Sequence, residues 1–410
     1  PEHHALLAEC LMERTSPDPV AVGRHLLLGG RPGHAARMLV VGLGEHRTRF
    51  GERAGLMACA LAQRALTGRP ASDPDWGRVA LENARALYGA GEQVAARDAV
   101  NALMVQTALY EWPAEIRLGA ALEQASMVVL SETPRAANAL LDAIESDPEI
   151  TEYYRFKVYF YRYAMGEMIN DMDQCRRNGL IACRLLEGIG DATSRFSAAQ
   201  IRGVLGFMFD DIDEAEPWVL EAVDRSVLTG SIQSRAKALH NLGKVHWYRG
   251  RWAEAERVLE QSEELYLQAG SVSLGNPRLI RIQVRLVQGA FTDALALCQD
   301  LVDKLPAESV SLRILASVAR AGLHQWDGFD QQFARIQGEL RARGWCNGED
   351  AAALEQLGQL ALAQGRLDTA RLVWDEALDH WQRHDKREHK EARVREWLAS
   401  LAAGRLGPDR

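Results

Sequence analysis

A short pattern of glycines and alanines recurs in this chain at nearly constant spacing. The clearest copies are Asn241-Leu242-Gly243 with Gly250 and Ala255, Gln288-Gly289-Ala290-Phe291-Thr292-Asp293-Ala294, and Gln356-Leu357-Gly358 with Gly365 and Ala370. Gly250 and Gly289 are 39 residues apart. A helix-sized motif repeated at a period of roughly 20–50 residues is typical of arrays in which each unit buries its apolar face against its neighbours. The spacing therefore predicts an elongated helical stack.

Apolar residues follow helical spacing nearly throughout, and no segment shows a convincing strand alternation. In residues 236–269, Leu239, Leu242 and His246 share one face of a first helix, and Gly250 ends it. We expect Gly243, and Gly358 in the repeat at 351–380, to allow close approach of the second helix, since glycine has no side chain. We expect Gly365 to lie at a turn, as Gly250 does. The predicted fold class is all-α, an α-solenoid of antiparallel helix pairs, with about twenty helices in roughly ten pairs.

Composition narrows the classes of function. The 410 residues carry a formal net charge of −8, which gives no general attraction to nucleic acid or to anionic membrane. The six cysteines show no C-x-x-C spacing, so we expect a reducing, cytoplasmic environment. No apolar run approaches the ~20 residues of a membrane span. We therefore expect neither nucleic acid nor membrane as a partner.

The repeated positions resemble the tetratricopeptide repeat, which has Leu-Gly in its first helix, a turn Gly, and Ala in its second helix. The resemblance is strong at 236–306, which ends with Pro306, and at 351–380. At 204–228 Leu205-Gly206 and Ala215 are kept, with a turn interpreted as shortened. It is weaker at 311–343 and at 114–148. The resemblance implies a superhelix with a concave groove that binds a partner.

Residues 1–48 differ from the repeats that follow. They contain His4-Ala5-Leu6-Leu7-Ala8-Glu9, Asp18-Pro19-Val20-Ala21, Arg24-His25-Leu26-Leu27-Leu28-Gly29-Gly30 and His34-Ala35-Ala36. This order resembles the helical segment after the winged helix in bacterial signal-transduction ATPases with numerous domains (STAND), including maltose-regulon-activator-like and kinase-linked proteins. We expect a lead-in over 1–48 and the solenoid over 49–410. The phosphate-binding motif G-x-x-x-x-G-K-[ST] is absent, so the chain is interpreted as a fragment of such a protein.

Two groups of residues are candidates for binding. Residues 153–163 hold seven aromatic residues, interpreted either as an aromatic and cationic wall or as a helix buried on two sides. The second group lies on the predicted groove side of successive first helices, where Phe207 and Gln283 are taken as equivalents of Lys244. The predicted ligand- or partner-binding residues are Tyr159, Phe207, Lys237, His240, Asn241, Lys244, Trp247 and Gln283. Their cations favour an anionic or carboxylate-bearing partner, and the alternative is a solvated helix face.

Metal and catalytic sites receive little support. His380 and His384 have metal-ligand spacing, with Asp379, Asp385 and His389 nearby, but the charge-dense segment is interpreted as a solvated face. No nucleophile elbow, H-E-x-x-H or kinase motif occurs. We expect no cofactor and no enzymatic activity.

Three functions stay open from the sequence. The first is a non-catalytic sensor or interaction arm of a signalling ATPase or kinase, which binds a protein, a peptide or a small-molecule effector. The second is a free-standing scaffold or adaptor. The third is a cytoplasmic peptide-pheromone receptor.

Overall fold

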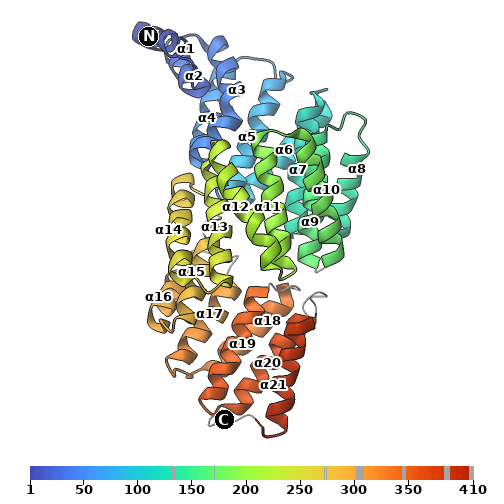
Figure 1. Ribbon diagram of the computed structural model, residues 1–410. Coiled ribbons are helices and arrows are strands. Elements are labelled where there is room, and N and C mark those ends of the chain that lie inside the picture. Colours follow the sequence, from blue (N-terminus) through green and yellow to red (C-terminus); the bar gives the residue numbers. More distant parts are fainter. Residues whose placement is uncertain are drawn as a thin grey trace.

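The chain is a stack of helices that follow one another along a single long body (Figure 1). The computed structural model describes residues 1–131, 134–169, 171–271, 273, 275–301, 309–343, 348–382 and 388–405. Within these ranges there are 21 helices and no strand. Each helix packs chiefly on its neighbours in the sequence. The prediction of an all-α helical-repeat solenoid is therefore confirmed.

The helices are of ordinary length from one end to the other. The first ten are α1 (Glu2–Met12), α2 (Pro19–Leu28), α3 (Pro32–Phe50), α4 (Glu52–Leu66), α5 (Pro74–Gly89), α6 (Gln93–Leu109), α7 (Ala114–Ser131), α8 (Pro134–Glu145), α9 (Glu152–Ile169) and α10 (Met172–Ile189). The next six are α11 (Ala192–Met208), α12 (Ile212–Leu228), α13 (Ile232–Tyr248), α14 (Trp252–Ala269), α15 (Gly275–Val287) and α16 (Phe291–Leu301). The last five are α17 (Ser309–Gly322), α18 (Phe329–Arg343), α19 (Gly348–Ala363), α20 (Leu367–Gln382) and α21 (Glu388–Ala402).

A left-handed residue ends the first helix of five successive pairs. These residues are Asp210 (φ 59°), Gly250 (φ 71°), Gly289 (φ 76°), His324 (φ 58°) and Gly365 (φ 72°). In each case the next N–H donates to the carbonyl five residues back, as Arg251 N does to His246 O at 2.8 Å. This is the hydrogen bond of a Schellman cap, which satisfies a carbonyl that the helix end leaves free. One turn geometry thus joins the two helices of every pair from α11 to α20.

The shortened turn predicted for 204–228 is wrong. The turn between α11 and α12 has the same hydrogen bonds as the others, with Asp210 in the position of Gly250. Asp tolerates left-handed backbone better than most residues with a side chain, so a search for glycine misses this turn. In the corrected register Gly203 is the equivalent of Gly243. The corrected register also makes Phe207 the equivalent of Trp247, whereas the sequence suggested that Phe207 is the equivalent of Lys244.

Small residues set the distance between α13 and α14 and between α19 and α20. A Cβ on Gly243 would lie 2.5 Å from Leu259 Cδ2, and one on Gly358 would lie 2.3 Å from Trp374 Nε1. Ala255 and Ala370 are fully buried in the first turn of α14 and α20. The predicted close-contact roles of Gly243 and Gly358 are confirmed, as are the predicted positions of the two alanines.

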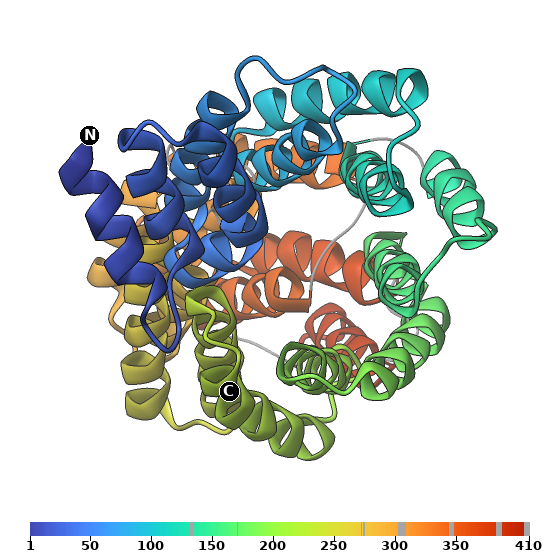
Figure 2. The same cartoon turned by 90° about the horizontal axis from the view of Figure 1, so that it is seen from above.

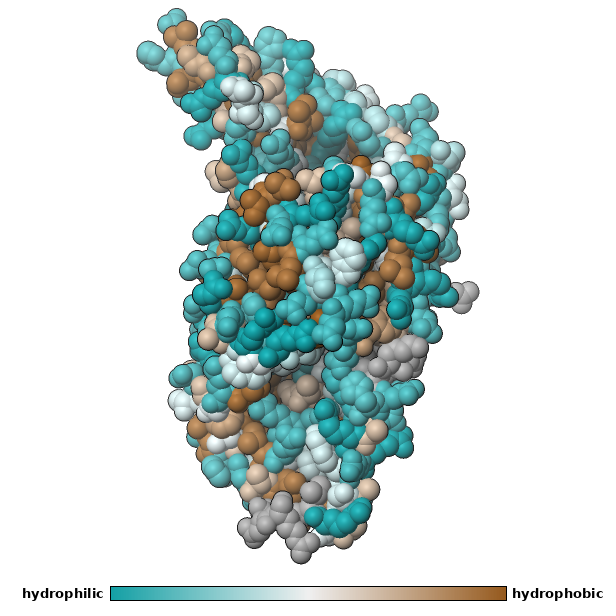
Figure 3. All heavy atoms as spheres, in the orientation of Figure 1, coloured by the Kyte–Doolittle hydropathy of each residue, from teal (hydrophilic) through white to brown (hydrophobic). Residues whose placement is uncertain are grey.

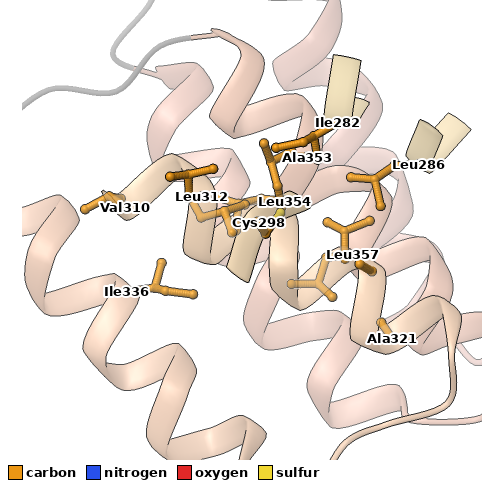
Figure 4. Close-up of a cluster of buried hydrophobic side chains, with 14 of the residues drawn as sticks. Ile282, Leu286, Cys298, Val310, Leu312, Ala321, Ile336, Ala353, Leu354 and Leu357 are labelled. Atoms are coloured by element: carbon orange, nitrogen blue, oxygen red, sulfur yellow. The ribbon is translucent and has the colours of Figure 1, made fainter. Parts of the chain in front are cut away.

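The hydrophobic core runs along the stack as a series of clusters. Figure 4 shows one of them, in which Leu286 of α15, Cys298 of α16, Leu312 of α17, Ile336 of α18 and Leu357 of α19 meet. Because five consecutive helices contribute to this cluster, each pair depends on its neighbours for burial. On the face drawn in Figure 3, polar residues cover most of the surface and hydrophobic residues form separate patches.

Contacts between helices far apart in the sequence close the superhelix on itself. Seen from above, the helices curve around a ring (Figure 2). Glu52 of α4 is 2% exposed and accepts a hydrogen bond from Gln233 of α13. Near the other end, Asp210 bonds His389 Nε2 at 3.0 Å and Lys390 Nζ at 3.1 Å, both on α21. These contacts hold one superhelical turn against the next.

The predicted division into 1–48 and 49–410 falls within α3, which continues to Phe50. The two-part organisation stays a prediction. None of the helices in the described ranges is long and apolar enough to cross a membrane.

Candidate functional site

The aromatic run 153–163 forms most of α9 and packs on two sides. Phe156 and Tyr163 are buried with residues of α10 and α11, whereas Tyr154 and Tyr161 pack against the cluster of α7 and α8. The hydroxyl of Tyr159 donates to Glu145 Oε1 at 2.8 Å. This arrangement corresponds to a helix buried between neighbours. It engages most of the run, including the Tyr159 hydroxyl, in internal packing.

The other predicted residues lie on three successive first helices, α11, α13 and α15. Phe207 is on α11, Gln283 is on α15, and the remaining five are on α13. The structure thus places seven of the eight predicted residues on neighbouring helices. We name this set of three helix faces the inner row, and Tyr159 lies on the preceding first helix, α9.

Lys244 is held by an acid from the next superhelical turn. Its Nζ lies 2.6 Å from Glu349 Oε1, at the start of α19, and 5.0 Å from the centre of the Phe207 ring. The side chains of Lys244 and Glu349 are 18% and 20% exposed, so the pair is partly shielded from water. Glu349 therefore supplies from within the chain the carboxylate that the sequence predicted for a partner.

His240 adds no positive charge to this region at neutral pH. Burial and the nearby Lys244 lower the pKa of His240 to about 3. The residue is partly exposed, but Nδ1 is enclosed and has no hydrogen-bond partner. The region thus holds a neutral imidazole at His240 and, at Lys244, a predicted cation that is already matched by a carboxylate.

Three predicted groove residues are more buried than the sequence suggested. Phe207 is 4% exposed and stacks on Tyr248, with ring centres 5.9 Å apart. Asn241 is 5% exposed and donates to Gln200 Oε1 at 2.6 Å, and Gln283 is 8% exposed. An aromatic or amide side chain on a first helix is covered when the next helix is close, which the sequence alone does not reveal. The expectation of exposed aromatics is wrong for Phe207.

Trp247 and Lys237 differ in their exposure to solvent. Trp247 is partly buried and packs against the cluster that includes Leu259 and Ile280. Lys237 is exposed. The row as a whole is polar and close to neutral, with aromatic packing at one end, and it suits hydrogen bonding better than anion binding.

Part of this region matches a known family. Residues 200–268 match the tetratricopeptide repeat. The match covers the second half of α11, all of α12 and α13, and α14 except its last residue, and it includes Phe207 and all five predicted residues of α13.

Two solved structures share the fold of the chain over most of its length. A Rap protein complexed with competence and sporulation factor has 11% identity and a TM-score of 0.54, and the match covers 80% of this chain and 99% of that one. A STAND protein with a tetratricopeptide repeat sensor from Pyrococcus horikoshii has 14% identity and a TM-score of 0.50. That match covers 96% of this chain and 55% of the Pyrococcus chain. At these identities the likeness shows the fold alone. No curated protein matches the sequence.

Polar atoms without partners recur along the inner row. Gln200 Nε2, His240 Nδ1 and Gln283 Oε1 are buried and have no hydrogen-bond partner. Gln200 was missed because it lies in the repeat whose register was misread, although it is the equivalent of His240. Glu349 was missed because nothing in its local sequence links it to Lys244.

The candidate metal pair lies only partly in the described residues. His384 and Asp385 fall outside them. His380 is 1% exposed with Nε2 3.4 Å from Glu376 Oε1, and His389 bonds Asp210, in the turn between α11 and α12. Among the described residues, no three His, Cys, Asp or Glu side chains are grouped as a metal site would require.

Proposed function

We propose that this chain is the non-catalytic sensor or interaction arm of a larger signalling ATPase or kinase, and that it binds a protein, a peptide or a small effector along the inner row. The observation that carries the proposal is the match over 96% of the chain to a STAND protein with a tetratricopeptide repeat sensor. The chain spans 55% of that protein, as an arm of a larger molecule would. The expected setting is the cytoplasm.

The chemistry of the inner row supports a polar, hydrogen-bonding partner. Unpaired buried donors and acceptors cost free energy of about 1–3 kcal/mol each. Gln200, His240 and Gln283 each leave such an atom free. Because these atoms are enclosed in the free chain, a partner reaches them only by displacing the side chains around them. A peptide backbone, which carries both donors and acceptors, would then satisfy them better than an apolar ligand.

The Rap protein favours a second candidate function. It matches this chain over 99% of its own length, and its structure contains competence and sporulation factor. A free-standing receptor for such a factor would need no ATPase. A scaffold or adaptor would likewise act alone.

The reading frame before Pro1 separates these functions. A P-loop ATPase or a kinase encoded upstream supports the arm. An initiator methionine immediately before Pro1 overturns it and favours a free-standing receptor or scaffold.

The partner is first isolated by its binding to the intact protein. Calorimetry with that partner then tests whether it binds at the inner row. We expect Lys244→Glu to weaken binding because it removes a hydrogen-bond donor and places two acids together. Glu349→Gln is the companion variant, which removes the acid and leaves Lys244 in place. Arg371→Glu, on an exposed face of α20, is the matched control. Full affinity in Lys244→Glu and in Trp247→Ala would exclude the inner row as the binding surface.

A further inference from the structure

A small cavity lies between α16, α17 and α18, away from the inner row. It has a volume of about 250 Å³ and is half enclosed. Its polar lining comes from all three helices and consists of Gln299, Arg313, Ser317, Arg320, Gln332 and Arg335. Three of these six residues are arginines, and none of the six is acidic.

The arginines are only partly neutralised by the protein. Arg313 and Arg335 both pair with Glu339, the latter at 2.9 Å. The guanidinium of Arg320 donates to Gln332 Oε1 at 2.5 Å, and no carboxylate in the described residues lies within ion-pair distance of it. Three guanidinium groups against one carboxylate leave a local charge of +2.

Small side chains create the space between these cations. Ala316 and Ser317 lie three and four residues after Arg313 on α17, and Arg320 lies four and three residues after them, so all four share one face. The alanine and serine leave a hollow between the two arginines. Ser317 donates its hydroxyl hydrogen to Arg313 O at 2.9 Å, so its oxygen is held in place.

The floor of the cavity is apolar and uncharged. It consists of Cys298, Leu312 and Ile336, which belong to the core cluster of Figure 4. Burial raises the pKa of the Cys298 thiol to about 12, so this side chain adds no negative charge at neutral pH. An anion in the cavity would therefore face cations and amides at the rim and a neutral floor.

We propose that this cavity binds a small phosphomonoester. A phosphate monoester carries a charge near −2 at neutral pH, which balances the local +2. Guanidinium forks match the geometry of phosphate oxygens and bind them with paired, charge-assisted hydrogen bonds. The volume admits a phosphate group with a few further atoms and excludes a folded segment of protein. A bound metabolite would bridge α17 and α18, the two helices of one pair, and would also contact α16 of the preceding pair.

The test is isothermal titration of the full chain with inorganic phosphate and with O-phosphoserine, in low salt at pH 7.5. We expect saturable binding of both, with O-phosphoserine at least as tight as phosphate. Arg320→Gln and Arg335→Gln should each weaken binding about tenfold, since each removes a charge-assisted contact. Arg320→Lys keeps the charge but loses the fork, and its affinity should lie between those of the wild type and Arg320→Gln.

The controls separate this site from general charge effects. Arg371→Gln removes an exposed arginine of α20 and should leave the affinity unchanged. Circular dichroism of every variant confirms that the helices are intact. No saturable binding to either probe, equal binding of acetate, or an affinity that Arg371→Gln lowers as much as Arg320→Gln does would each overturn the proposal.

Discussion

At the scale of single residues, the repeat turns show how the chain uses left-handed backbone. Gly250, Gly289 and Gly365 adopt it at no steric cost, whereas Asp210 and His324 adopt it with a side chain. Asp210 has a compensating role, because its carboxylate holds His389 and Lys390 of α21. His324 is exposed and no ion pair involves it in the described residues. The two residues therefore respond differently to the same substitution.

We expect His324→Gly to stabilise the protein by about 0.5 kcal/mol. Relief of the left-handed backbone contributes about 1–2 kcal/mol, and the greater freedom of glycine in the unfolded chain removes about 0.4–1 kcal/mol of that. Asp210→Gly should destabilise the protein instead, because it breaks the contact with α21. Asp210→Asn tolerates the backbone and loses only the charge. Urea denaturation gives all three free energies of unfolding, and equal effects of Asp210→Gly and His324→Gly would contradict this account.

His240 predicts a loss of stability in acid. Its pKa is lowered to about 3 in the folded chain, mainly by burial, against about 6.5 when unfolded. The unfolded chain therefore binds the extra proton first, and stability falls as the pH drops from about 6.5 toward 3, by up to about 1.4 kcal/mol per pH unit. His240→Gln removes this contribution. The free energy of unfolding measured at pH 7.5 and pH 5 should differ less in His240→Gln than in the wild type, and an unchanged difference would count against burial of the neutral ring.

At the scale of helices, a glycine sets the spacing of α13 with α14 and of α19 with α20, and the other residues fill the space that remains. Gly243 faces the side chain of Leu259, and Gly358 faces the indole of Trp374. The partner residues are among the most deeply buried in the chain. The large side chains of Leu259 and Trp374 therefore fill the space that the missing side chain of the glycine leaves. Each glycine and its large partner residue pack as a unit.

Gly243→Leu is expected to overpack α13 against α14 at a cost of about 1–3 kcal/mol. The matched control is Gly338→Leu in α18, where an added Cβ has no atom within 4 Å. Leucine is a better helix former than glycine, so this control should raise stability by up to about 1 kcal/mol. Thermal unfolding followed by circular dichroism measures both. A neutral result for Gly243→Leu would show that α13 and α14 can separate without loss.

At the scale of the whole molecule, ion pairs connect one superhelical turn of the solenoid to the next. Lys244 of α13 meets Glu349 of α19, and Asp210 meets α21. Neither pair joins neighbouring repeats, so local packing does not impose them. They hold the inner row in one shape, and a partner that binds there would compete with or reinforce the contact of Lys244 with Glu349.

Exchange of the two charges tests this role. Lys244→Glu and Glu349→Lys should each lower the free energy of unfolding by about 1 kcal/mol, a value between those of exposed and buried ion pairs. Each variant should also lengthen the molecule, as measured by small-angle scattering. The double variant Lys244→Glu/Glu349→Lys should recover part of both effects, since it restores an ion pair with reversed charges. Additive losses in the double variant, with no change in the scattering curve, would show that the pair does not hold the two turns together.

The sequence alone determined the elements, the pairing and most of the turns. Helical periodicity, the turn glycines and the small residues at close contacts are local features, because each depends on a few residues and on steric rules that act within one helix pair. That is why the roles of Gly243, Gly250, Gly358 and Gly365 were predicted correctly. The turn at Asp210 was misread because two residue types satisfy the same backbone requirement, and the error moved Phe207 to the wrong register.

Only the tertiary structure decided what the predicted site residues do. The partner of Lys244 depends on the pitch of the superhelix, which is the sum of small rotations from repeat to repeat and is not encoded in any one segment. The same sum buries Asn241 and Gln283 and brings Asp210 to α21. The cavity with three arginines likewise arises from three helices whose side chains meet only once the stack has formed.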